Sequence, residues 1–234
     1  MKAAMIVFFL LGTLTVSGMD AREVIGRMQK VYATEKLAYK CTYSLFRGHT
    51  SDVAHQSYEG YVYRQGELLY QQTDQTELIY GKDFFLRINH EEQAMELNAA
   101  QQAPPATMNT DQALKECSEV LLEDKGAYYE IKLVIKNTSS LPFSQILMRI
   151  GKKNYHLEQL DMYYTTVQDF STDGKQDLQL SHLRIAFGAL DTAPESRPAL
   201  FTTASYLKQD GDALVPVGAC TGYELIDNRL KRTR

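Results

Sequence analysis

The chain has 234 residues, of which 44% are hydrophobic and 23% are charged, and its formal net charge at pH 7 is −4. This mild acidity gives no support to a nucleic-acid or anionic-membrane partner. Fifteen tyrosines and no tryptophan fit a sheet-rich protein with amphipathic aromatic positions. The length allows one domain or two, and large sheets often form a single domain of this size.

The first residues have the pattern of an export signal. Lys2 precedes an apolar run that is well short of the ~20 residues of a membrane-spanning helix, and Ser17-Gly18 offers small residues for cleavage. We expect a signal peptide over 1–18, with Ala21 as a second possible cleavage point and a buried N-terminal helix as the alternative. Its removal takes Lys2 away and leaves a soluble, exported chain with a formal charge of −5.

A helix is predicted from Asp20 to Lys36. Asp20 is a plausible N-cap, because Glu23 follows three residues later. Apolar residues then recur at helical spacing, which gives the helix one apolar side that needs a partner surface. These residues are Val24, Ile25, Met28, Val31 and Tyr32.

The segment from Ala38 to Leu97 is predicted to be a row of short strands. Its first strand alternates strictly, with Tyr39, Cys41 and Tyr43 on one side and polar residues on the other. The strands are separated by turns such as Gly66-Glu67 and Gly81-Lys82-Asp83. Connections this short join antiparallel neighbours, since a parallel crossover needs a dozen or more residues. We therefore expect a large antiparallel meander.

A second helix is predicted over Thr110–Leu122, with Ala113, Leu114, Cys117, Val120 and Leu121 on its apolar side. The linker before it, Ala99–Asn109, contains two prolines and two glutamines and is expected to cross the surface. Together they are predicted to form a lid over a cavity, with Leu114, Cys117 and Leu121 facing inward. The alternative is that this helix belongs permanently to the core.

Strands resume after this helix, over Tyr129–Ile135, Phe143–Ile150, Tyr155–Tyr164 and Leu178–Phe187. The segment Pro194–Pro198 interrupts the pattern. The tail from Leu200 is predicted to form a short hairpin around Asp210-Gly211-Asp212, followed by an extended piece over Gly222–Ile226.

The sequence contains no recognisable catalytic or metal-binding arrangement. Its five histidines are scattered, and no nucleophile elbow, phosphate loop or zinc-type cysteine pair is found. Three cysteines, Cys41, Cys117 and Cys220, allow one disulfide or none, and their spacing does not decide between these. We therefore predict a protein that is not an enzyme and uses no cofactor and no metal.

The apolar face of the sheet is the remaining functional feature. About ten or more strands contribute apolar residues while two helices are available as cover, and a curved sheet of this kind can enclose a ligand cavity. The parity of each strand gives the predicted lining, although a register error of one residue would move a whole strand to the other face. The predicted lining residues are Tyr43, Leu45, Tyr61, Tyr63, Phe84, Leu86, Ile88, Ile131, Leu133 and Met148.

The order of these segments resembles a known family. A signal peptide and a helix ending in Met28–Ala33 precede a strand that begins at Ala38. The segments Gly60–Tyr63, Glu77–Lys82, Phe85–Met95 and Asn154–Tyr164 follow in the same order. From Asp20 to Phe187 this pattern resembles the LolA-type outer-membrane lipoprotein carriers.

The resemblance implies an α+β fold, an incomplete antiparallel β-barrel whose concave apolar face is lidded by helices. It implies one domain over 19–234, with a C-terminal extension from about 199 that the simplest carriers lack. In the family the cavity receives lipoprotein acyl chains in the periplasm, so the expected partners are a lipid or acylated protein and a membrane-bound loading or receiving protein. We expect a monomer. The competing hypothesis is an interaction module whose own helices fill the cavity and which docks a protein partner.

Overall fold

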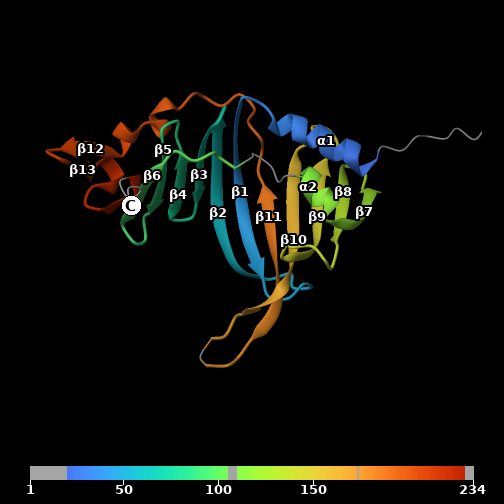
Figure 1. Cartoon of the computed structure of the whole chain (residues 1–234). Helices are drawn as coiled ribbons and strands as arrows, with labels where there is room; N and C mark the ends of the chain where they lie inside the picture. The colour runs from blue at the N-terminus through green and yellow to red at the C-terminus, as the bar shows by residue number, and fades with distance from the viewer. Residues whose placement is uncertain (1–19, 105–109, 173, 230–234) are drawn as a thin grey trace, which may run out of the picture.

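The computed structural model describes residues 20–104, 110–172 and 174–229. About half of them belong to one large curved sheet (Figure 1). The helices are α1 (Ala21–Tyr32) and α2 (Thr110–Lys115), and short 3-10 turns are Pro198–Phe201, Thr203–Ser205 and Gly218–Cys220. The strands are β1 (Lys36–Phe46), β2 (Ala54–Gln65), β3 (Leu68–Thr73), β4 (Thr76–Tyr80), β5 (Phe84–Asn89), β6 (Ala94–Ala99), β7 (Cys117–Asp124), β8 (Tyr128–Ile135), β9 (Phe143–Gly151), β10 (Leu157–Asp169), β11 (Leu178–Phe187), β12 (Leu207–Asp210), β13 (Ala213–Pro216) and β14 (Glu224–Asp227).

The main sheet consists of two antiparallel meanders joined at its centre. Among the described residues its twelve strands follow the order β14-β6-β5-β4-β3-β2-β1-β11-β10-β9-β8-β7. Strand β1 pairs with both β2 and β11, and β14 adds a parallel strand beside β6. The two edges, β14 and β7, do not pair with each other, so the sheet stays open. The predicted α+β class and incomplete barrel are confirmed.

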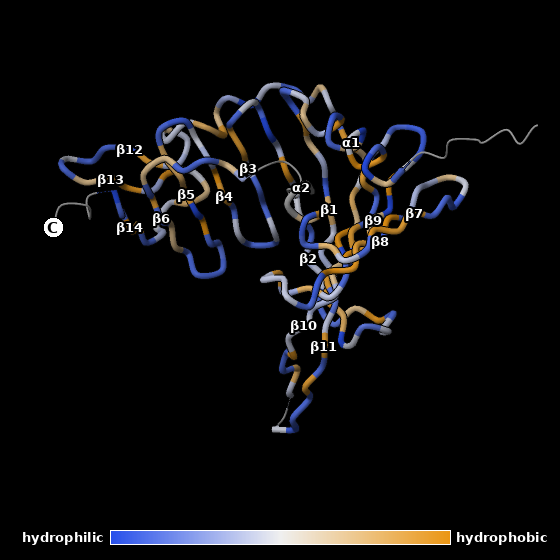
Figure 2. Tube along the Cα trace, turned by 45° about the vertical axis from the view of Figure 1, so that its right-hand side comes forward, coloured by the Kyte–Doolittle hydropathy of each residue, from blue (hydrophilic) through white to orange (hydrophobic). Residues whose placement is uncertain are grey.

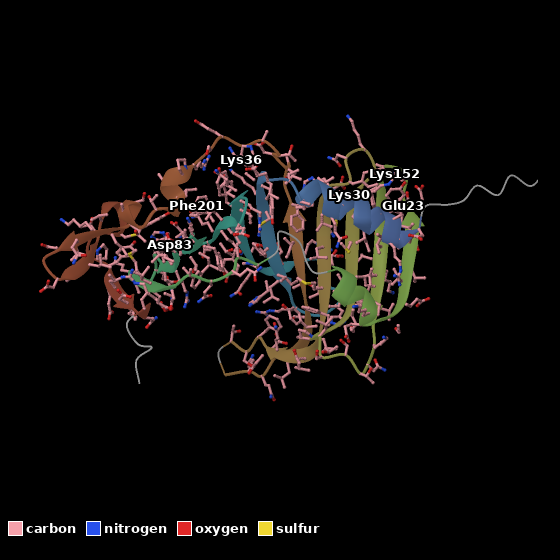
Figure 3. The ribbon with its side chains drawn as sticks, turned by 45° about the horizontal axis from the view of Figure 1, so that its top comes forward. Glu23, Lys30, Lys36, Asp83, Lys152 and Phe201 are labelled. Carbon is pink, nitrogen blue, oxygen red and sulfur yellow. The ribbon has the colours of Figure 1, made fainter. Side chains whose placement is uncertain are left out.

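Helix α1 lies across one face of this sheet, which we call the helix face (Figures 1 and 3). The Asp20 side chain accepts a hydrogen bond from the Glu23 backbone amide at 2.7 Å, which confirms the predicted N-cap. The buried residues Val24, Ile25 and Met28 face the strands. The helix ends at Tyr32, four residues earlier than predicted, because β1 already begins at Lys36.

The two faces of the sheet carry two separate hydrophobic clusters. Leu37 and Tyr39 of β1 belong to the cluster under α1, whereas Ala38 between them belongs to the other cluster. Alternate residues of a strand point to opposite faces, so the second cluster marks the face opposite the helices. The C-terminal segment covers this second face, which we call the tail face. Figure 2 shows hydrophobic stretches of β8 and β9 near α1 and others near the tail.

The tail is part of the folded core. Phe201, Leu207 and Cys220 are buried in the second cluster, and the Phe201 ring stacks on Tyr63 with centroids 5.9 Å apart. The hairpin of β12 and β13 and the extended strand β14 confirm the two elements predicted for this region. The extension therefore closes the tail face of the strands that follow β1.

The second predicted helix is wrong beyond Lys115. The structure has one short helix, α2, and then strand β7 from Cys117 to Asp124. Pairing with β8 overrides the helical spacing, because Val120 faces Leu133 and Leu122 faces Ile131 across the sheet. A period of two also fits these apolar residues, and strand pairing satisfies the backbone along the whole segment.

Candidate functional site

Rows of apolar residues run across the helix face and supply the candidate site. One row crosses six strands from β7 to β1, each residue paired with the next. Helix α1 completely covers its middle part, where Ile131 is 0% and Met148 is 1% exposed. The row consists of Leu122, Ile131, Met148, Leu160, Ile185 and Tyr43.

Beyond α1 the apolar surface is only half covered. Tyr43, Leu45, Met162, Leu183 and Ile185 form adjacent pairs on β1, β11 and β10, and all five are half-buried. We call these five residues the apolar strip. Apolar side chains left partly open over neighbouring strands can bury the surface of an apolar ligand.

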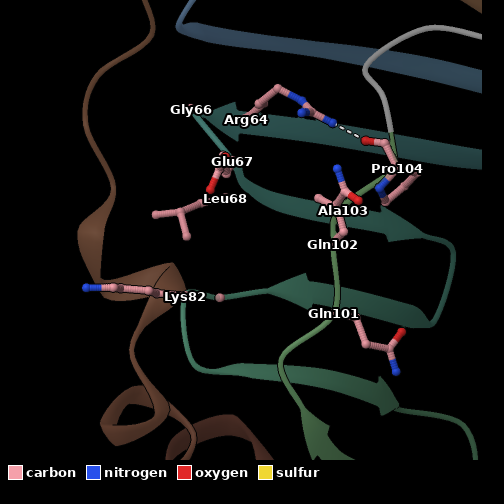
Figure 4. Close-up of a pocket in the computed structure, with 10 residues that line it drawn as sticks. Arg64, Gly66, Glu67, Leu68, Lys82, Gln101, Gln102, Ala103 and Pro104 are labelled. Carbon is pink, nitrogen blue, oxygen red and sulfur yellow. Dashed lines mark hydrogen bonds between the residues drawn. The ribbon is translucent and has the colours of Figure 1, made fainter.

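A cavity of about 760 Å³ lies on the same half of the molecule as β2–β4 (Figure 4). Its wall on one side is the crossing segment, residues 100–104, which runs back from β6 over β3 and β2. Ala103 of this segment packs against the helix-face cluster and Leu68 packs against the tail-face cluster, so the cavity lies at the strand ends between the two faces. The lining residues are Arg64, Gly66, Glu67, Leu68, Gly81, Lys82, Gln101, Gln102, Ala103 and Pro104.

Arg64 fastens the crossing segment to the sheet. Its Nη2 atom donates a hydrogen bond to the carbonyl oxygen of Pro104, as the dashed line in Figure 4 shows. Arg64 is paired with Leu37 and Leu69 on the neighbouring strands, so its side chain rises on the helix face. Burial lowers the pKa of its guanidinium.

Burial also shifts the pKa values of other groups around the helix-face core. It raises the pKa of Tyr39 to about 12 and lowers that of His156, which lies against Tyr32 of α1. Both shifts disfavour the charged form, as expected where water is excluded. The three cysteines are free thiols, and burial raises the pKa of each, so none has the character of a reactive thiolate.

The structure divides the ten predicted lining residues between the two faces. Five lie on the helix face, where Tyr43 and Leu45 are in the apolar strip and the other three are sealed under α1. Five belong to the tail-face cluster and are covered by the C-terminal segment. The helix-face group is Tyr43, Leu45, Ile131, Leu133 and Met148, and the tail-face group is Tyr61, Tyr63, Phe84, Leu86 and Ile88.

The three residues predicted for the lid helix are also separated. Leu114 of α2 and Cys117 of β7 pack partly buried against the helix-face cluster. Leu121 is 43% exposed on β7 and lies outside this cluster. Residues 105–109 of the predicted lid loop lie outside the described residues, and the crossing segment is the part of the loop that the structure places.

Sequence reasoning missed the role of Arg64 and of the crossing segment. The sequence held one signal for Arg64. In β2 this charged residue alternates with tyrosines and has the same parity as the apolar Val62, so it had to lie on an apolar face of the sheet. Within the described ranges, no group of three His, Cys, Asp or Glu side chains is arranged to hold a metal ion. Nor does any helix in those ranges have the length and apolar character needed to cross a membrane.

No family model and no curated protein matches the chain. Its structure is similar to a DUF1329 family protein from Desulfovibrio piger, with a TM-score of 0.40, 14% identity and coverage of 78% of this chain and 96% of that one. It is similar to a LolA superfamily protein from Nitrosomonas europaea, with a TM-score of 0.31, 8% identity and coverage of 80% and 100%. It is also similar to the lipoprotein LppX from Mycobacterium tuberculosis, with a TM-score of 0.37, 10% identity and coverage of 74% of this chain and 95% of that one.

A LolA superfamily protein is among the solved structures that this chain is similar to. These identities and TM-scores are too low to transfer a function from any of these proteins.

Proposed function

We propose that this protein is an exported, non-enzymatic binding protein that holds the hydrocarbon chain of a lipid or of an acylated protein on its helix face. The chain would lie along the apolar strip. The observation that carries this proposal is the apolar strip itself, whose five aliphatic and aromatic side chains stay half-buried on three adjacent strands of the helix face.

Burial of apolar surface supplies the affinity in this account. Each buried methylene contributes about 0.8 kcal/mol before the ordering of the ligand is subtracted. The strip offers aliphatic and aromatic side chains from three strands, so a chain lying across it exchanges water for hydrocarbon contacts along its length. The predicted leader at 1–18 supports a site of action outside the cytoplasm.

A second candidate function is docking of a protein partner by a module whose interior is already filled. The observation that favours it is the complete burial of Ile131, Leu133 and Met148 beneath α1, which leaves no room for a ligand on that half of the helix face. On this alternative the apolar strip would be the contact surface for a partner polypeptide.

Uptake of a fluorescent fatty acid tests the binding proposal. We expect saturable uptake by the delipidated protein, and native mass spectrometry after gentle purification should show copurified lipid. Ile185→Asp should abolish uptake, because it places a carboxylate in the apolar strip. Ala186→Asp is the matched control: Ala186 is the next residue of β11, is exposed and points to the opposite face.

Thermal unfolding of both variants shows whether a loss of uptake reflects a loss of folding, and Met162→Gln provides a milder change in the same strip. Equal uptake by the wild type, Ile185→Asp and Met162→Gln would refute the proposed site. Absence of both copurified lipid and uptake in the wild type would refute the proposed function and favour the docking module.

A further inference from the structure

Strand β7 lies at the outer end of the main sheet (Figure 1), and among the described residues only β8 pairs with it. The hairpin of β7 and β8 closes where the Lys125 amide donates to the Tyr128 carbonyl oxygen at 3.0 Å. Hydrogen-bonded pairs alternate with non-hydrogen-bonded pairs in an antiparallel ladder, so the backbone of every second residue before Lys125 points toward β8. The amide and carbonyl groups of Val120 and Leu122, which lie between those residues, therefore point to the open edge.

The apolar surface of the helix face also stops at this edge. Val120 and Leu122 lie half-buried against the helix-face cluster, and Leu122 ends the apolar row that crosses the sheet from β1. Leu121 points to the opposite face and is 43% exposed. An added strand would bury apolar side chains on both faces while it paired the free backbone groups. Exposed strand edges bind extended peptides in this way.

The charged side chains of β7 are all acidic. Glu119 and Glu123 flank Leu121 on the face opposite the helices, and both are exposed. Glu119 forms no ion pair within the described ranges, Glu123 is paired with Lys125 of the adjoining turn, and Lys132 lies one strand further in. Pairing with β7 of a second copy about Leu121 would set Glu119 against Glu123, and like charges directly opposite destabilise a sheet. The charges therefore favour a different strand, one with basic side chains at these positions.

We propose that β7 binds an extended segment of a partner protein as an added strand, in which three apolar residues stand between two basic ones. The apolar residues lie opposite Val120, Leu121 and Leu122, and the basic residues lie opposite Glu119 and Glu123. This pattern reads the same in both directions, so it suits a parallel or an antiparallel partner. Two strands, β8 and β9, separate this edge from the apolar strip, so the inference does not depend on the proposed lipid-binding function.

Fluorescence anisotropy with two labelled peptides tests the chemistry of the partner. The first peptide is Gly-Lys-Val-Leu-Val-Lys-Gly, and the second has glutamate in place of both lysines. We expect the full chain to bind the basic peptide saturably and about tenfold more tightly than the acidic one, with a difference that shrinks in high salt. Glu119→Lys should weaken binding of the basic peptide about fivefold. Glu92→Lys reverses an exposed carboxylate at the turn between β5 and β6 and should leave binding unchanged.

Amide hydrogen exchange measured by NMR tests the position of the added strand. Saturation with the basic peptide should slow exchange at the amides of Val120 and Leu122 about tenfold, whereas the Leu121 amide is already paired with β8. Val120→Pro removes an outward donor and keeps the ladder to β8, so it should abolish peptide binding.

Thermal unfolding shows whether Val120→Pro is folded, and Glu119→Lys tests the same edge without any change to the backbone. Absence of binding by the wild type, or equal binding of the two peptides, would overturn the inference. Binding that leaves exchange at Val120 and Leu122 unchanged would also overturn it, because the peptide would then lie elsewhere.

Discussion

Arg64 of β2 holds Pro104 of the crossing segment by a hydrogen bond from its guanidinium Nη2 to the proline carbonyl oxygen. The two residues are 40 positions apart in the chain, and this contact ties the connection after β6 to the centre of the helix face. The crossing segment has no strand partner, so the proline carbonyl is available as an acceptor. The hydrogen bond from the Arg64 side chain therefore holds the segment against the sheet.

Removing the Arg64 side chain should loosen the crossing segment. We expect Arg64→Gln to speed hydrogen exchange at the amides of Gln101, Gln102 and Ala103 by about fivefold, because the lost contact contributes roughly 1 kcal/mol. Exchange in β8 and β9 should not change. Arg87→Gln serves as the control, and identical exchange at the three amides in both variants would contradict the fastening role.

Helix α1 should behave as permanent core. Met28 of α1 is 1% exposed and packs against the sheet. Met28→Ala is therefore expected to lower the free energy of unfolding by about 3 kcal/mol, because it removes buried apolar surface and leaves a cavity. Lys30→Ala, at an exposed position of the same helix, should change it by less than about 0.5 kcal/mol. Urea unfolding measures both, and a small loss in Met28→Ala would indicate that α1 moves away from the sheet.

Two ion pairs on the sheet should differ strongly in their effect on stability. Asp161 is 1% exposed and accepts from Arg184 Nε at 2.7 Å, so Arg184→Gln leaves a buried carboxylate without its charge partner. We expect a loss of about 3 kcal/mol. Arg87→Gln breaks the exposed pair with Glu96 and should cost less than about 1 kcal/mol. If Arg184→Gln and Arg87→Gln lowered the free energy of unfolding equally in denaturant unfolding, this would contradict the burial assigned to Asp161.

His156 should make the protein less stable in mild acid. Burial lowers its pKa in the folded state, so the unfolded chain binds a proton more readily than the native one. Its contribution is fully present above the unfolded-state pKa of about 6.5 and declines as the pH falls below that value. His156→Leu should therefore flatten the pH dependence of the unfolding free energy between about pH 7 and about pH 5. Urea unfolding curves measured across this pH range test this. A wild-type slope that persists in His156→Leu would assign the acid sensitivity to another group.

The strands and their antiparallel order were predictable because they rest on local signals. Turns such as Gly66-Glu67 leave too few residues for a crossover, and alternation in β1 correctly put Tyr43 and Leu45 on one face. The tail hairpin followed from Asp210-Gly211-Asp212 in the same way, and Gly211 has the positive φ of 59° that such a turn needs.

The face on which each later strand buries its apolar residues could not be predicted from the strand's own sequence. The most apolar parity there, with Phe84, Leu86 and Ile88, is buried by the tail and not by the helices. Only the pairing of Tyr39 with Val62 shows that Tyr61 and Tyr63 point away from α1. Such pairing is a long-range property that parity within one strand does not contain.

Strand β7 and the Arg64 contact could not be predicted either, because both depend on residues far apart in the sequence. Leu114, Cys117 and Leu121 fit a helical period, and the pairing of β7 with β8 decided otherwise. The partner of Arg64 is a backbone carbonyl 40 residues away, so no spacing in the sequence marks it.

Photo-crosslinking with a diazirine fatty acid, followed by peptide mapping, tests the central claim most directly. The account predicts labels on peptides that carry Tyr43, Met162 and Ile185, three residues of the apolar strip on the helix face. Excess unlabelled fatty acid should suppress these labels. Labels concentrated on Phe84, Leu86 and Ile88 of the tail face, or no label that excess fatty acid suppresses, would contradict it.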